Sequence, residues 1–376
     1  MPVPHRLAPE PVTAEDSAVE ADLPGQVRQT LADYLQTRRA QSRELDAAFA
    51  EAVDELVQFV LGGGKRIRPT FAWWGWRAAG GPAEGPQATA MLQVASSLEL
   101  LQACALVHDD LIDDSDTRRG NPTVHQAFAA QHRRRAWHGS AEQFGVAAAV
   151  LLGDLALAWA DDMLHSAGMP PEALVRGLRP WRAMRTEVLA GQYLDTLGPV
   201  RGDETPQAAL RIDELKAASY TVQRPLELGA ELAGAGEPTL EALRRFGCDI
   251  GVAFQLRDDL LGVFGDPEVT GKPAGDDLRE GKRTLLVAEG FQSAREHGDQ
   301  DALALLQGVL GDPDLDEKRV ELAREALVRL GAVDAVERRI TELTGTAMAA
   351  LHGARLDETA AARLAELAVA VTDRSR

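Results

Sequence analysis

Two short acidic clusters are the residues of this sequence best suited to chemistry. In the first, a helix would place Asp109 and Asp113 four residues apart on one face, with Asp110 and Asp114 as a second pair beside them. Like charges at this spacing repel, at a cost of roughly 0.2–0.5 kcal/mol per pair. Because the preceding segment is apolar, the carboxylates need a counter-charge. Mg²⁺ would supply it, since it binds through one or two carboxylates plus substrate phosphates.

The second cluster is Asp258-Asp259, which follows Phe254 and Gln255 near the end of another apolar segment. Two adjacent aspartates alone indicate little, and for the first cluster the alternative is a solvated helix end or an N-cap for the next element. Two acidic helix ends in one helical chain could instead face each other across a cavity, and a diphosphate carried by magnesium ions would fill that gap.

Cations suited to phosphate lie near both clusters. A turn of three glycines at 62–64 precedes Lys65, Arg66 and Arg68, without the spacing of a P-loop. Lys65 could contact phosphate oxygens through its single ammonium charge, and Arg68 through the paired N–H donors of its guanidinium group. Arg118 and Arg119 follow the first cluster and could pair with surface aspartates or bind phosphate. Further isolated cations are Lys216, Lys272 and Lys282.

Together these groups suggest a specific chemistry. Carboxylates would hold magnesium, the metal and the cations would hold a diphosphate, and apolar helix faces would hold a hydrocarbon. The sequence therefore indicates departure of diphosphate from a hydrocarbon chain, with metal ions stabilising the leaving charge.

The elements that must position these residues are helices. The chain is rich in Ala, Leu, Glu and Arg, and aromatic residues make up only 5%. We expect an all-α protein, with a long apolar helix over about 86–115 that ends in the first cluster. Residues 1–24 are rich in Pro, Ala, Glu and Asp, and we expect a disordered tail there. Residues 25–376 would form a single all-helical domain.

Charge and composition exclude other classes. The net charge of −18 argues against a nucleic-acid partner. The two cysteines, Cys104 and Cys248, imply no disulfide framework, and the first 24 residues contain no apolar stretch that could cross a bilayer. We therefore expect a cytoplasmic protein that does not span a membrane.

At these residues the sequence resembles the trans-isoprenyl diphosphate synthases, or polyprenyl synthetases, over roughly residues 27 to 350. Four motifs occur in the family's order: GGGKRIRP at 62–69, DDLIDDSDTRRG at 109–120, GQYLD at 191–195 and FQLRDDLLGVFGD at 254–266. A DDxxD motif followed closely by RRG is highly specific.

The resemblance implies a bundle of mostly antiparallel helices around a deep central cavity, usually in a homodimer. It implies condensation of isopentenyl diphosphate with an allylic diphosphate. Asp109, Asp113 and Asp258 would hold Mg²⁺, in three ions with bound diphosphate, supported by Asp110 and Asp259. Gln192 and Asp195 would lie near the metal site. Isopentenyl diphosphate would be bound by Lys65, Arg68, Arg119 and Gln102, and the allylic diphosphate by Arg118, Lys216, Lys272 and Gln255. Lys282 matches the family's basic segment after the second motif.

Three positions depart from the family pattern. Gln102 replaces a frequent His, and we expect its amide to take over the contact with phosphate. Ala217 replaces the Thr that commonly follows the lysine at 216, which removes one hydroxyl. Gly262 replaces the last Asp of the second motif, so the second metal site is expected to be weaker.

The product is expected to be the twenty-carbon geranylgeranyl diphosphate. In the family, bulky aromatics four or five residues before the first Asp stop the chain at fifteen carbons, and here these positions are the small Ala105 and Cys104. Leu101 and Leu98, which lie further from the acidic cluster, would narrow the path of the tail.

Two alternatives differ in class. A terpene cyclase would share the bundle but should carry an Asn/Asp-Ser-Glu metal motif, where this chain has DDLLG. A non-catalytic regulatory subunit of a heteromeric synthase should have lost aspartates from the first motif, and here they are present.

Overall fold

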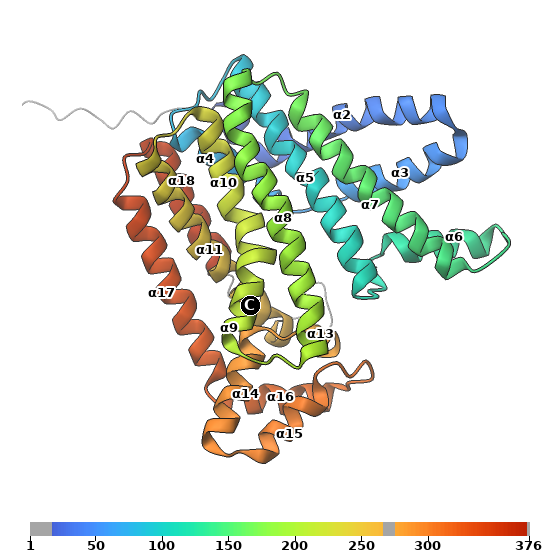
Figure 1. Ribbon diagram of the computed structural model, residues 1–376, viewed down its shortest axis with the longest axis vertical. Coiled ribbons are helices and arrows are strands. Elements are labelled where there is room, and N and C mark those ends of the chain that lie inside the picture. Colours follow the sequence, from blue (N-terminus) through green and yellow to red (C-terminus); the bar gives the residue numbers. More distant parts are fainter. Residues whose placement is uncertain (1–16, 266–274, 374–376) are drawn as a thin grey trace, which may run out of the picture.

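The computed structural model describes residues 17–265 and 275–373, and helices dominate it (Figure 1). Within these ranges the strands β1 (Thr117–Arg118) and β2 (Asn121–Pro122) form one antiparallel pair, with Arg118 opposite Asn121. The prediction of an all-α fold is confirmed.

The first half of the chain contains α1 (Ala18–Ala21), α2 (Leu23–Leu45), α3 (Ala47–Leu61), α4 (Ile67–Ala78), α5 (Pro86–Ile112), α6 (Val124–Arg134), α7 (Ala141–His165) and α8 (Pro171–Arg201). The second half contains α9 (Pro206–Ile212), η1 (Asp213–Gln223), α10 (Arg224–Ala233), α11 (Glu237–Phe264), α13 (Asp276–Arg279), α14 (Leu285–His297), α15 (Gln300–Val309), α16 (Glu317–Arg329), α17 (Ala332–His352) and α18 (Glu358–Thr372).

Helical structure begins before the boundary that we placed at residue 24. Ser17 caps α1 by accepting a hydrogen bond from the Glu20 amide, and α2 starts at Leu23. Leu23 and Val27 are buried in the main core, which holds this segment in place. Residues 1–16 of the expected tail lie outside the described residues.

Helix α5 lies within the main hydrophobic core and packs against α2, α4 and α7. By length and composition, α5 and α7 are both apolar enough to cross a membrane. The most apolar window of α5 is 78% buried inside the protein, against 39% for α7. Helix α5 is therefore a core helix, whereas α7 keeps an exposed apolar face. A second core lies around α14 to α17, at the lower end of Figure 1.

One rod runs from α9 through η1 to α10, and its middle part packs against α8 and α11 (Figure 1). Its middle segment, η1, is an 11-residue π-helix between two α-helical segments. Neighbouring helices approach its backbone through glycines. A Cβ atom on Gly191 of α8 would lie 2.4 Å from the Lys216 nitrogen, and one on Gly251 of α11 would lie 2.6 Å from the Ala218 Cα. Larger residues there would push η1 away from α8 and α11.

Candidate active site

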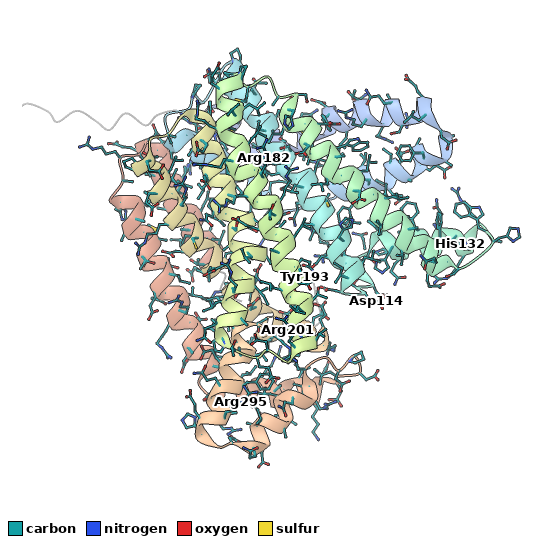
Figure 2. All side chains as sticks on the ribbon, viewed as in Figure 1. Asp114, His132, Arg182, Tyr193, Arg201 and Arg295 are labelled. Carbon is teal, nitrogen blue, oxygen red and sulfur yellow. The ribbon has the colours of Figure 1, made fainter. Side chains whose placement is uncertain are left out.

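The first acidic cluster lies at the C-terminal end of α5, where the helix stops. Asp113 is the C-cap, and its amide still donates to the Asp109 carbonyl at 2.9 Å, so the two carboxylates stay close. Asp114 has a left-handed backbone (φ 51°), and its side chain is 96% exposed at the lower end of α5 (Figure 2). The Asp110 side chain is fully buried. The predicted Asp110–Asp114 pair is therefore wrong, because the helix ends between them.

Arg118 returns toward α5 through the β1–β2 turn. Its Nε donates to Asp110 Oδ1 at 2.5 Å, and its Nη2 to Asp109 Oδ2 at 3.3 Å. The alternative of a surface pair with Asp114 or Asp116 is not what the structure shows. Arg118 is thus a counter-charge at the base of the first cluster, with part of its side chain still exposed.

Lys216 reaches the same cluster from η1. Its Nζ lies 2.6 Å from Asp195 Oδ2 on α8 and 3.1 Å from Asp109 Oδ1 on α5. Gly191 and Asp195 both belong to the GQYLD segment, so one motif provides both the space for the lysine backbone and the partner for its ammonium group. This places Asp195 at the site, as the resemblance implied; Gln192 is half-buried on the same helix.

The pKa values of the two metal-ligand candidates of α5 are shifted in opposite directions. Burial would raise the pKa of Asp109, but Lys216 and Arg118 outweigh it and lower that pKa below its ordinary value. Burial raises the pKa of Asp113 to about 6, and the negative charge of Asp109 adds to the effect. Asp113 would therefore gain most from a bound cation near neutral pH.

The second acidic cluster lies near the end of α11 and is more deeply enclosed. Asp259 is only 4% exposed, and Gln255 Nε2 donates to its Oδ1 at 2.7 Å. Asp213, the first residue of η1, is also buried, and burial together with the charge of Asp195 raises its pKa to about 8. Burial and then the charge of Asp213 raise the pKa of Asp259 as well. Asp258 beside them is half-buried.

Lys282 connects the electrostatics of the two clusters. Its Nζ lies 2.5 Å from Glu280 Oε2 and 3.5 Å from Asp277 Oδ1, beside the end of α11. Its charge also acts on Asp109 and Asp113 and opposes the effect of burial on both pKa values, although the pKa of Asp113 stays raised. Lys216 on η1 and Lys282 near the end of α11 therefore both act on the acidic end of α5. Lys272 lies outside the described residues.

A third group of residues surrounds the glycine turn. Arg119 Nη1 donates to the Gly63 carbonyl at 2.7 Å, so the turn and the RRG segment touch. Arg68 Nη2 donates to Thr221 Oγ1 at 2.8 Å, and its guanidinium lies 4.1 Å from the centre of the Tyr220 ring. The Tyr220 hydroxyl donates to Gln102 Oε1 on α5, which links Gln102 to this group. Lys65 is exposed on the turn.

Arg66 has a structural role within the turn. Its backbone is left-handed (φ 52°), and its buried guanidinium pairs with the buried Glu99 of α5 and donates to the Val60 carbonyl at 3.0 Å. This buried pair fixes the turn to α5 and leaves the neighbouring Lys65 and Arg68 to point elsewhere.

The four predicted chain-length residues lie on α5 at different angles. Ala105 and Leu98 are four and eleven residues before Asp109, on the same side of the helix, and Leu101 lies beside them. Ala105 is half-buried, whereas Leu98 and Leu101 are buried. Cys104 Sγ lies 3.7 Å from His108 Nδ1, and His108 Nε2 lies 3.4 Å from the Val150 carbonyl of α7. Cys104 and His108 therefore belong to the α5–α7 contact.

Sequence reasoning missed Tyr220 and Asp213. Neither residue belongs to a recognised motif, and nothing in the sequence beyond their closeness to Lys216 indicates a role for them. The available signal was position: they lie three residues before and four residues after Lys216, a spacing that an α-helix would place on the same side as the lysine.

The carboxylates fit a magnesium site that is completed by its ligand. In the part of the chain that the structure describes, no three ligating side chains converge on one point. The buried Oδ2 atoms of Asp213 and Asp259 have no hydrogen-bond partner among the described residues. Buried carboxylate oxygens without donors suit a cation, and Mg²⁺ commonly takes only one or two carboxylates, with waters and phosphates completing its shell.

Comparison with known proteins supports the same conclusion. The family model described as polyprenyl synthetase matches residues 49–326. A geranylgeranyl pyrophosphate synthase from Corynebacterium glutamicum, solved in complex with isoprenyl diphosphate and magnesium, is 44% identical with a TM-score of 0.90, over 94% of this chain and 99% of that one. A geranylfarnesyl diphosphate synthase from Aeropyrum pernix is 32% identical over 76% of this chain and 90% of that protein. A farnesyl diphosphate synthase from Mycobacterium tuberculosis is 38% identical over 60% of this chain and 56% of that protein.

Proposed function

Because the chain belongs to the polyprenyl synthetase family and is a trans-prenyltransferase, we propose that it joins isopentenyl diphosphate head-to-tail to allylic diphosphates. One observation carries the proposal: Arg118 and Lys216 pair with the acidic end of α5, and the charge of Lys282, which pairs with Asp277 beside the end of α11, acts on the same carboxylates. Such an arrangement matches a diphosphate bound with divalent cations.

The allylic diphosphate would lie between the two acidic helix ends. Asp109, Asp113 and Asp258 are the proposed magnesium ligands, with Asp110 and Asp259 in support, and three ions would be held together with the diphosphate. Bound magnesium would stabilise the negative charge that develops on the departing diphosphate. Arg118 and Lys216 now neutralise Asp109 and would turn toward the phosphate oxygens when the substrate is bound. Gln255 and Lys272 complete this proposed subsite.

Isopentenyl diphosphate would lie at the glycine turn. Lys65, Arg68 and Arg119 would bind its diphosphate, with Gln102 as a donor through its amide group. Tyr220 supports this subsite, because its ring contacts the Arg68 guanidinium and its hydroxyl donates a hydrogen bond to the Gln102 side-chain oxygen. The Gln102 amide nitrogen is thereby directed away from Tyr220 and is available to phosphate.

The proposed reaction begins with ionisation of the allylic substrate. The C–O bond to diphosphate breaks, the double bond of isopentenyl diphosphate attacks the allylic cation, and a proton is then lost to the departed diphosphate. His108 is unsuited as the base, because its ring packs against α7, where a Cβ on Gly153 would lie 2.1 Å from Nε2. A fluorinated allylic substrate should react much more slowly, and equal rates would contradict ionisation.

The proposed product is geranylgeranyl diphosphate. The small side chain of Ala105, one turn before Asp109, supports a tail path longer than fifteen carbons. The relatives include synthases of fifteen-, twenty- and twenty-five-carbon products, so the proposed product length depends on the side chains that α5 carries before Asp109.

We further propose a homodimer that covers the exposed apolar face of α7 and α8. Leu151 of α7 is 69% exposed, and Leu189 and Tyr193 of α8 are 63% and 67% exposed. Large exposed apolar side chains that gather on one face are typical of an interface. We also propose that the protein is cytoplasmic and does not span a membrane.

The decisive experiment combines the purified protein with Mg²⁺, isopentenyl diphosphate and five-, ten- or fifteen-carbon allylic diphosphates. We expect stepwise elongation to a twenty-carbon diphosphate, identified by mass spectrometry, and none with EDTA. A cyclic hydrocarbon from the allylic substrate alone would indicate a terpene cyclase, and no turnover would indicate a regulatory subunit. Light scattering of the same sample should give the mass of a dimer.

A further inference from the structure

Arg257 directly precedes Asp258 in the second acidic cluster, and three hydrogen bonds hold its guanidinium. Its Nη1 and Nη2 donate to the two carboxylate oxygens of Glu337 at 2.6 and 2.7 Å, and its Nε donates to the Thr372 carbonyl at 2.9 Å. A planar guanidinium that donates two parallel bonds to one carboxylate is fixed in direction as well as in position. The Arg257 side chain, which is only 16% exposed, therefore has one orientation on α11.

The two partners of Arg257 come from the C-terminal part of the chain. Glu337 lies on α17, Thr372 is the last residue of α18, and both helices pack beside α11 (Figure 1). The last carbonyls of a helix have no partner within that helix, so the carbonyl of the buried Thr372 gains a positively charged donor from Arg257. This contact closes the end of α18 onto the turn of α11 that contains Asp258.

Helix α18 is fixed at its other end as well. The Asp357 amide, which lies just before α18, donates to the Ala78 carbonyl of α4 at 3.3 Å. Leu364, in the middle of α18, is buried in the main hydrophobic core. A helix that is held at both ends and packed along one face is a rigid partner. The Thr372 carbonyl is therefore a fixed point for the Arg257 guanidinium.

The contacts of Arg257 bear on the rotation of α11 at the second acidic cluster. Successive residues of an α-helix differ in direction by about 100°, so a guanidinium held toward α17 and α18 determines where the next two side chains point. Gln255 donates to Asp259, but both residues belong to α11, and this bond turns with the helix. The contacts of Arg257 come from other helices, so they help to set the direction of Asp258 and Asp259.

We propose that Arg257 is a positioning residue for the second acidic cluster, and that through Arg257 the C-terminal helices α17 and α18 support binding of the magnesium-bound allylic diphosphate. This inference rests on the proposed function. The competing role is structural: the contacts of Arg257 could serve only to hold α17 and α18 against α11.

The test measures binding of Mg²⁺ in the presence of inorganic diphosphate by calorimetry, together with steady-state rates. Arg257→Met removes the charge and the paired donors. We expect its Mg²⁺ affinity to fall on the order of 10-fold, as is usual when a group that orients a metal ligand is lost. The KM for the allylic diphosphate should rise with it, whereas the KM for isopentenyl diphosphate should stay within about twofold of the wild type. A loss of stability alone would not distinguish the two substrates.

Two further variants separate positioning from stability. Arg257→Lys keeps the charge but lacks the paired donors, so it should recover only part of the lost Mg²⁺ affinity. Arg244→Met is the matched control, because Arg244 also lies on α11 and is 20% exposed, with Glu227 and Glu237 at 2.8 and 2.7 Å. It precedes Asp258 by about four helical turns. Arg244→Met should lower the thermal midpoint and leave Mg²⁺ affinity unchanged.

Unchanged Mg²⁺ affinity in Arg257→Met would overturn the inference, and so would an equal loss of affinity in Arg244→Met. If Arg257→Met did not fold, wild-type affinity in Arg257→Lys would overturn it instead. Glu337→Gln combined with Arg257→Met should lose no more affinity than Arg257→Met alone, because both act through one pair, and additive losses would contradict that pair. A wild-type protein that neither binds Mg²⁺ with diphosphate nor elongates substrates would refute the proposed function.

Discussion

The first and second acidic clusters have similar sequences but are held by different means. At the end of α5, Asp109 is paired with Arg118 and Lys216, and its pKa is lowered despite burial. At the end of α11, Asp259 is buried with Asp213 and Asp277 as acidic neighbours, and its pKa is raised. The first cluster is thus paired directly with two of the protein's own cations, whereas at the second cluster burial and acidic neighbours raise the pKa of Asp259, and the cation Lys282 pairs with Asp277.

This difference suggests a division of roles. A carboxylate that stays ionised at neutral pH can bind the first metal ions before the substrate arrives. Because metal ligands must lose their protons, the raised pKa of Asp259 should make cation binding at the second cluster more dependent on pH.

The largest expected effect comes from Asp109. Asp109→Asn should reduce turnover by roughly 10³-fold, because the charge that stabilises the transition state is lost. Asp258→Asn should reduce turnover less and raise the Mg²⁺ concentration needed for half-maximal rate. Steady-state rates across a Mg²⁺ titration measure both variants. A larger loss from Asp258→Asn would reverse the assigned roles.

The next effect contrasts two aspartates of the first cluster. Asp110→Asn should slow turnover by about 10²-fold, since it removes the buried partner that holds Arg118 in place. Asp114→Asn is the matched control, because its side chain is almost fully exposed, and it should stay within about twofold of the wild type. Initial rates compare them, and equal losses would show that Asp114 turns inward when substrate binds.

A third comparison uses equivalent positions on the two helices, each four residues before the first aspartate. Ala105→Phe on α5 should shorten the product to fifteen carbons, because the ring would block the tail, and Leu101→Ala should lengthen it. Phe254→Leu on α11 should leave product length unchanged. Mass spectrometry of the products decides this, and an unchanged product from Ala105→Phe would place the tail elsewhere.

The smallest effect concerns stability and pH. Burial raises the pKa of Asp213 to about 8, so between pH 4 and 8 the folded state binds more protons than the unfolded state. Without metal, the free energy of unfolding should therefore fall as pH rises through this range. Asp213→Asn should remove part of the slope and raise the thermal midpoint at pH 8, by about 2–4 °C for each 1 kcal/mol gained. A pH slope as steep as that of the wild type would exclude Asp213 as its source.

The sequence predicted the fold and most of the site, because both depend on local patterns. The apolar run before Asp109 and the ordered motifs were enough to identify α5, the acidic ends and the cations Arg118 and Lys216. What it could not predict depends on where a helix ends or on contacts between distant segments. Asp114 has a left-handed backbone and lies beyond the end of α5, so the expected Asp110–Asp114 pair does not form. Asp277 meets Gly262 only after the chain has turned back onto α11.

The π-helix η1 also affects how the molecule opens. Its backbone bonds span five residues and occur rarely in proteins, commonly at functional sites. The segment carries Asp213, Lys216 and Tyr220, so its geometry is maintained by contacts with α5, α8 and α11 as well as by its own amides. In hydrogen–deuterium exchange, we expect amides of residues 213–223 to exchange faster than those of α10, which continues the same rod. Binding of diphosphate with magnesium should slow their exchange and leave that of α17 unchanged.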